Sequence, residues 1–515
     1  MIGGCGKSNP AMSEFPLGYE RIAPTTWVYL SSILMLGLFF KFNRVWSIRN
    51  FDLILLILLA PGLLLVFHSG ITNPTELEAT VAKNDSPTNE KPPPDSALDG
   101  KTGAADPNED AAADSSKSEE NSEAASPPAN GPQLTKKQEQ ARLGYVWLLV
   151  VGGLFVIRML VDTKLMRRPL LEPNLSTGGM VFIGCSLLIF LMANIVTSKP
   201  SAADLEGPRD AARMVHREAT SEDDDSLTRH GPGNPLLSFF PNLLTISSSS
   251  NVSKEHQYAN AAKVMAIIAN LAIVVGLVII GSRHFGSMKT GVAVAAVFLM
   301  LPYTAIWNAH AKHVIPAALM VWAIVCYRRP AIAGVFVGLA AGVLYYPLFL
   351  IPLWVSFYWS RGKWWFLAGT GITLAIMAGS LAFVSEDFDH FVAQLRMMFG
   401  FWLPLQDNLT GVWGLGWDPV YRLPILVAFI AMSVTFALWP SRKNLGTLIC
   451  CSAALMAATQ FWHGHNMGGG VYLAWYAPLA LLAIFRPNLE DRVAISVLAE
   501  SWRRRRNGQG LTKAA

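Results

Sequence analysis

Two pairs of closely spaced histidines are the residues of this chain best placed to do chemistry. His310 and His313 flank Lys312, and His463 and His465 are separated by a single glycine. Imidazole can act as an acid or a base, hold a phosphate or bind a metal ion. On a helix, His310 and His313 would share a face and could bind one metal ion or phosphate group. Each pair also has a plain structural interpretation, as an anchor at a membrane surface or as part of a helix connector.

The chain that must position these groups is strongly apolar. It has 515 residues, of which 52% are hydrophobic and 15% charged, and its mean hydropathy is +0.35. A soluble domain usually carries about 25% charged residues. Apolar runs of roughly 20 residues, long enough to cross the hydrocarbon of a bilayer, recur along the chain. The sequence therefore predicts an all-α polytopic membrane protein. The net charge of +5 does not point to nucleic acid, because the basic residues lie at the ends of the apolar segments.

The positions of lysine and arginine predict how these segments cross the membrane. If every segment crosses, all basic connections fall on one side, and the positive-inside rule makes that side cytoplasmic. The N-terminus is then outside and the C-terminus is in the cytoplasm. We expect about thirteen transmembrane segments, at 26–42, 50–67, 143–162, 178–196, 261–281, 290–308, 311–327, 331–343, 346–359, 364–384, 422–439, 444–460 and 471–486.

The same pattern divides the chain into four parts. Residues 1–70 form an N-terminal two-helix membrane unit, and residues 143–486 form the main helical membrane domain. Residues 71–142 between them are rich in Pro, Ala, Ser, Asp and Glu, which is typical of a disordered linker. Residues 487–515 form a basic cytoplasmic tail. Nine of the ten histidines fall on the outer face of this arrangement, where the loops are also longest, so a site on that face is expected.

A stretch in the middle of the chain resembles the GT-C class of membrane glycosyltransferases. A predicted helix at 178–196 is followed by a long outer loop, and His230-Gly-Pro-Gly-Asn-Pro-Leu-Leu237 is similar to the GPxxPLL stretch that ends this loop in such families. The segment from Gly338 to Pro347 looks like part of their helical hairpin. The resemblance covers about 178–360, a third of the chain. It implies a GT-C core and transfer of a sugar from a polyprenyl-phosphate carrier, of the protein mannosyltransferase kind, on the non-cytoplasmic face.

The resemblance also suggests roles for particular residues. Such enzymes use an Asp or Glu soon after the first family helix as the catalytic base, and Asp204 is the first choice here, followed by Glu206 and Asp210. Members usually carry a lysine near the end of the Gly338 stretch to hold the lipid phosphate, whereas this chain has Leu344. A divalent metal ion is a further candidate for that role. The expected substrate-binding residues are His230, His310, Lys312, His313, Tyr345, Tyr346, His463 and His465.

Two other functions remain open on the sequence. A secondary transporter or lipid flippase would place ionisable groups at mid-membrane, whereas Arg158 lies near the end of a predicted helix and Asp52 stands where a helix-capping role is ordinary. A non-catalytic family member serving as a scaffold would explain the missing lysine. Membrane lipids and a polyprenyl-phosphate sugar are the expected partners. Cysteines in apolar segments, with no cleavable signal, favour a bacterial inner membrane.

Overall fold

The computed structural model describes residues 23–69, 136–164, 171–216, 233–246, 253–382, 385, 387–399, 413, 419–462, 471–490 and 492–498. Across these residues the protein is all-α. Its helices are α1 (Pro24–Phe39), α2 (Ile48–Ser69), α4 (Lys136–Asp162), α5 (Thr177–Val196), α6 (Ala202–His216), α8 (Gly233–Ile246), α9 (Lys254–Ile279), α10 (Met288–Met300), α11 (Pro302–Trp307), α12 (Ala311–Val325), α13 (Pro330–Val343), α14 (Ile351–Phe357), α15 (Lys363–Ala382), α16 (Phe388–Met398), α17 (Arg422–Leu438), α18 (Leu445–Ala458) and α19 (Val471–Phe485).

These helices are those of an integral membrane protein. Five of them, α2, α4, α5, α9 with its π-helical end, and α15, are long and apolar enough to cross a bilayer. Eight shorter apolar helices of 10–17 residues accompany them in the described residues. Each of the thirteen predicted segments overlaps one of these apolar helices, so the prediction of an all-α membrane protein is confirmed, whereas the number of crossings stays a prediction.

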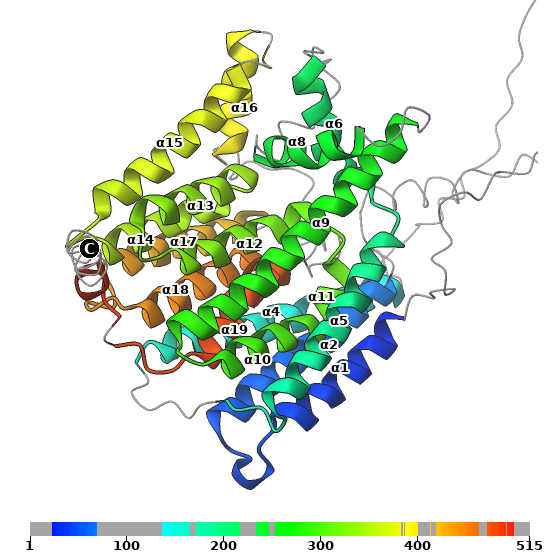
Figure 1. Cartoon of the computed structure of the whole chain (residues 1–515), viewed down its shortest axis with the longest axis vertical. Coiled ribbons are helices and arrows are strands. Elements are labelled where there is room, and N and C mark those ends of the chain that lie inside the picture. Colours follow the sequence, from blue (N-terminus) through cyan, green and yellow to red (C-terminus); the bar gives the residue numbers. More distant parts are fainter. Residues whose placement is uncertain are drawn as a thin grey trace, which may run out of the picture.

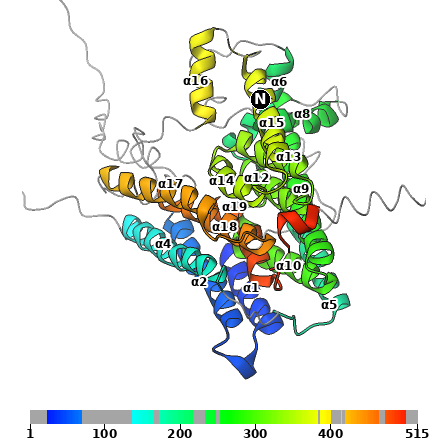
Figure 2. The same cartoon turned by 90° about the vertical axis from the view of Figure 1, so that its left-hand side faces the viewer.

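The helices form one bundle with a distinct end. In both views, α6, α8 and α16 lie toward the same end of the molecule, close to the upper parts of α9 and α15 (Figures 1 and 2). Helices α9, α12 and α13 pack side by side in the middle, and α18 and α19 pack against each other behind them. Two tryptophans that are fully buried, Trp354 and Trp462, belong to the core of this bundle. These three short amphipathic helices thus lie at one end of an apolar body.

Glycines allow α13 and α15 to pack closely. Gly334, Gly338 and Gly342 are spaced by four residues and therefore lie on one face of α13. A Cβ atom at Gly338 would stand 3.0 Å from the Cβ of Thr373, and one at Gly334 would overlap the carbonyl oxygen of Phe366. Small residues at this spacing let helix backbones approach each other, as is common in membrane proteins. The chain becomes extended at Leu344, so 331–359 forms two separate helical segments, as the sequence predicts.

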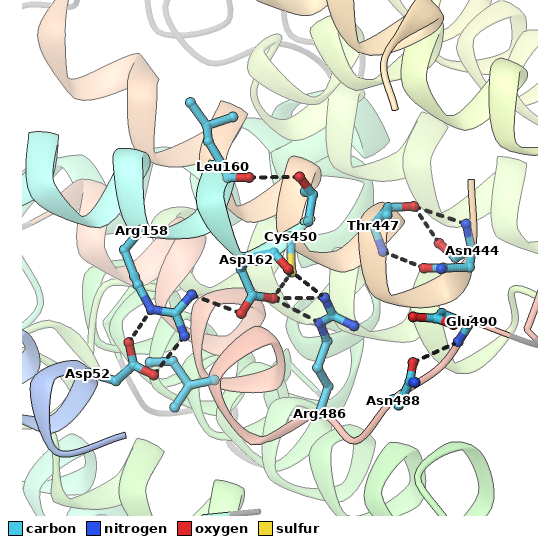
Figure 3. Close-up of polar contacts among 12 residues, drawn as sticks. Asp52, Arg158, Leu160, Asp162, Asn444, Thr447, Cys450, Arg486, Asn488 and Glu490 are labelled. Atoms are coloured by element: carbon cyan, nitrogen blue, oxygen red, sulfur yellow. Dashed lines mark hydrogen bonds and ion pairs between the residues drawn. The ribbon is translucent and has the colours of Figure 1, made fainter. Parts of the chain in front are cut away.

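A ladder of buried charges joins the N-terminal helices to the rest of the bundle (Figure 3). Arg158 on α4 donates to both carboxylate oxygens of Asp52 on α2, at 2.6 and 2.9 Å, and to Asp162 at 2.8 Å. Asp162 also accepts from Arg486 at 2.8 Å and from the thiol of Cys450 at 3.0 Å. The four charged side chains are at most 5% exposed. Asp52 is therefore not the capping residue that the sequence suggests, because its carboxylate turns inward to pair with Arg158.

Candidate functional site

Asp204 is held by the start of its own helix. The linker that follows α5 ends at Ser201, and Asp204 lies three residues later in the first turn of α6. Its Oδ2 accepts hydrogen bonds from the Ser201 backbone N–H at 3.1 Å and from the Ser201 hydroxyl at 2.6 Å. A carboxylate at this position commonly satisfies the free N–H group before a helix. The local sequence Ser-Ala-Ala-Asp therefore orients the carboxylate without any distant partner.

His310 brings a second titratable group to this carboxylate. The residue stands between α11 and α12, with φ −86° and ψ 84°, outside the helical region. Its Nδ1 lies 2.9 Å from Oδ2 of Asp204, although the two residues are 106 positions apart in the chain. Its ring also packs on Trp307, with the ring centroids 5.0 Å apart. The structure thus joins the first-choice acid to one of the predicted histidines.

The environment of Asp204 favours an ionised carboxylate. Burial of the side chain favours the protonated acid, but the hydrogen bond from His310, its electrostatic interaction with the carboxylate and the two hydrogen bonds from Ser201 outweigh it. Together they lower the pKa of Asp204 below its ordinary value. The pair therefore consists of an ionised acid in hydrogen-bond contact with an imidazole, the arrangement in which one group orients the other for proton transfer.

The other two predicted acids lie on the same helix in different surroundings. Asp210 is 2% exposed, and its Oδ1 is 3.6 Å from Arg213 one turn further along α6. Glu206 is half-buried. Of the three acids, Asp204 is the one whose contact with His310 the structure shows.

The remaining predicted residues of the α12 region form an aromatic cluster. His313 stacks on Trp475 of α19, at 5.8 Å and an interplanar angle of 26°. Tyr346 packs against the same tryptophan at 4.6 Å and against Tyr345 at 4.2 Å. Lys312, between the two histidines, is 7% exposed. These contacts place His313, Tyr345 and Tyr346 together, as a shared site would require.

The expectation that His310 and His313 share one helical face is wrong. Helix α12 begins at Ala311, so His310 precedes it and the three-residue helical spacing does not apply. His310 turns to α6 and His313 turns to α19. Within the described ranges, no group of three or more His, Cys, Asp and Glu side chains is arranged to hold a metal ion. His230, His463 and His465 lie outside the described residues.

Arg422 is a buried cation that the sequence analysis overlooked. It begins α17, is 4% exposed, and donates from Nε to the carbonyl oxygen of Trp462. The guanidinium is close enough to Tyr345 and Tyr346 to interact with them electrostatically. The sequence does contain a signal for this residue. Arg422 stands at the non-cytoplasmic end of a predicted transmembrane segment, where the positive-inside rule makes an arginine unusual. A buried cation beside tyrosines suits an anionic ligand.

A small cavity lies next to the Asp204–His310 pair. Its lining includes Trp307, which packs on His310, together with Asn270, Thr304 and Asn308. The Oγ1 of Thr304 and the Nε1 of Trp307 are buried, and neither has a hydrogen-bond partner in the part of the chain that the structure describes. Buried polar atoms usually have a partner, so these two could be satisfied by water or by the hydroxyl group of a ligand.

No protein-family model matches the chain, and no curated protein matches it in sequence.

Proposed function

We propose that the protein is a membrane glycosyltransferase of the GT-C kind. It moves a sugar from a polyprenyl-phosphate donor to an acceptor hydroxyl on the non-cytoplasmic face. The observation that carries this proposal is the contact of 2.9 Å between Asp204 and His310. It joins an ionised acid, in the first turn of α6 after the apolar helix α5, to a histidine that stands between α11 and α12.

The chemistry of sugar transfer needs the groups that this end of the bundle provides. The acceptor hydroxyl must lose a proton to a base, which the Asp204–His310 pair can supply. The phosphate that leaves with the lipid needs positive charge. Lys312, two residues after His310, and Arg422, which interacts electrostatically with Tyr345 and Tyr346, are buried cations. We assign them this task in place of the lysine that Leu344 replaces. A bound divalent metal ion would supply the same charge.

The topology belongs to the same proposal. We propose thirteen crossings of a bacterial inner membrane, with the N-terminus outside and the C-terminus in the cytoplasm. This topology puts the first turn of α2 and the last turns of α4 and α19 on the cytoplasmic side. The charge ladder supports this arrangement, because Asp52, Asp162 and Arg486 come from or adjoin those three ends and contact one another through Arg158. The outer face then holds α6 and α8.

Release of the lipid carrier tests the function. The purified protein in lipid is incubated with a panel of radiolabelled polyprenyl-phosphate sugars, and free polyprenyl phosphate is measured. We expect release by the wild type and at least a 100-fold loss in Asp204→Asn, the upper range for a removed acid–base group being about 10⁴-fold. The matched control is Glu255→Gln, an exposed acid at the start of α9. Folded wild-type protein that releases nothing from any donor would refute the proposal.

One observation favours a secondary transporter or flippase as the second candidate. Transporters carry buried ionisable groups inside the membrane domain, and the ladder of Asp52, Arg158, Asp162 and Arg486 is such a group. Every one of these charges has an opposite partner within 3.0 Å, which is equally the pattern of a structural clamp. Substrate uptake into proteoliposomes that Asp162→Asn abolishes, with no release of carrier lipid, would favour the transporter. If the protein shows neither carrier release nor uptake, the remaining candidate is the non-catalytic scaffold.

A further inference from the structure

The two members of the Asp204–His310 pair differ in what can reach them. The side chain of Asp204 is 0% exposed, whereas that of His310 is 21% exposed. Three donors already point at Oδ2 of the carboxylate: the Ser201 N–H, the Ser201 hydroxyl and His310. The other oxygen, Oδ1, is buried. An acceptor hydroxyl can therefore approach the imidazole but not the carboxylate as the site stands.

The histidine is oriented for such an approach. Its Nδ1 is used by Asp204, which leaves Nε2 as the ring nitrogen available to a ligand, and the described residues provide no hydrogen bond to it. Trp307 packs on the ring and adds a second constraint on its orientation. A carboxylate on Nδ1 fixes the tautomer with a lone pair on Nε2 and stabilises the imidazolium ion that forms when Nε2 takes a proton.

We propose that His310, through Nε2, takes the proton of the acceptor hydroxyl, and that Asp204 is a positioning residue that holds and charges the ring. This inference rests on the proposed function and assigns its base. The acceptor oxygen forms a bond to the anomeric carbon of the donor sugar as the bond from that carbon to the phosphate oxygen breaks. The bonding electron pair leaves with the polyprenyl phosphate. The acceptor proton moves to Nε2, and it later passes to water or to the released phosphate.

Chemical rescue separates this proposal from a carboxylate base. In His310→Ala the ring is missing, and added imidazole can take the proton only if the ring was the base. We expect kcat for carrier release to fall about 100-fold or more, with KM changed by less than about fivefold, and imidazole to restore kcat by at least about tenfold. Asp204→Asn should also be slow but should gain nothing from imidazole, because its own ring is still present.

The control is His256→Ala, an exposed histidine whose Nδ1 contacts the hydroxyl of Ser253 at 2.7 Å. It should behave as the wild type with and without imidazole. Folding of every variant is checked by the protection of the buried thiols of Cys450 and Cys451 from a maleimide.

The outcomes are separable. If the wild type releases no carrier from any donor, the proposed function fails and takes this assignment with it. If the wild type releases carrier but folded His310→Ala keeps more than about a tenth of its kcat, the base is not His310. Loss of activity in folded His310→Ala that imidazole does not restore, or an equal imidazole effect on Asp204→Asn, also overturns the assignment. Recovery confined to His310→Ala establishes it.

Discussion

Replacing Arg158 with Met should weaken the attachment of the N-terminal helices to the bundle. The substitution keeps an unbranched side chain but removes three hydrogen bonds, two to Asp52 and one to Asp162. Among the described residues, Asp52, which is fully buried, then keeps Arg49 at 3.6 Å as its cationic partner, while Asp162 keeps Arg486. Breaking a buried ion pair on one side typically costs about 3–5 kcal/mol, because the remaining charge is left in apolar surroundings. We expect the free energy of opening of this region to fall by about that amount.

The chain contains a built-in probe for this measurement. Cys450 and Cys451 are 0% exposed, and the Cys450 thiol donates to Asp162 of the ladder. With Cys5, Cys185 and Cys326 replaced by Ser, maleimide labelling in lipid reports exposure of these two thiols alone. A loss of about 3–5 kcal/mol should speed labelling by on the order of 100- to 5,000-fold when opening is in rapid equilibrium.

A double replacement and a control make this prediction refutable. Asp52→Leu together with Arg158→Met removes both charges, so the double variant should be more stable than Arg158→Met alone by at least about 1 kcal/mol. Arg442→Met, at an exposed arginine, should label as slowly as the wild type. If Arg158→Met labels at the wild-type rate, or if the double variant is no more stable than the single one, the ladder does not hold these helices.

Three further outcomes follow from the structure. Gly338→Leu should destabilise the α13–α15 contact by about 1–3 kcal/mol, because a Cβ there already meets Thr373 at 3.0 Å. Gly371→Leu, on the open face of α15, should not destabilise it. Thiol labelling compares the two variants. The pKa of Asp204 is lowered in the folded protein, so its ionised form stabilises the fold above the unfolded pKa of about 3.9. This stabilisation is lost as the pH falls through the folded pKa. The apparent unfolding temperature of Asp204→Asn should therefore vary less below about pH 4 than that of the wild type. Arg422→Met should lower kcat/KM for the donor by about 100-fold if the arginine holds the phosphate, and a chelator should have no effect unless a divalent metal ion shares that task.

The sequence by itself determined the helices and part of the site. Hydropathy and segment length are local properties, so the apolar helices could be located from composition, and the interruption near Leu344 from the prolines that follow it. The orientation of Asp204 is also local, because Ser201 stands three residues before it and supplies two of its hydrogen bonds.

Only the tertiary structure decided which of these groups meet. The contact between Asp204 and His310 spans 106 residues, and that between Asp52 and Arg158 also spans 106, so neither has a signature in local spacing. Local spacing was misleading for His310, because the helix begins one residue after it. A charged residue near the end of an apolar helix can cap it, face water or pair with a distant helix. Which of these occurs depends on the packing of the bundle, because burial makes an opposite partner necessary.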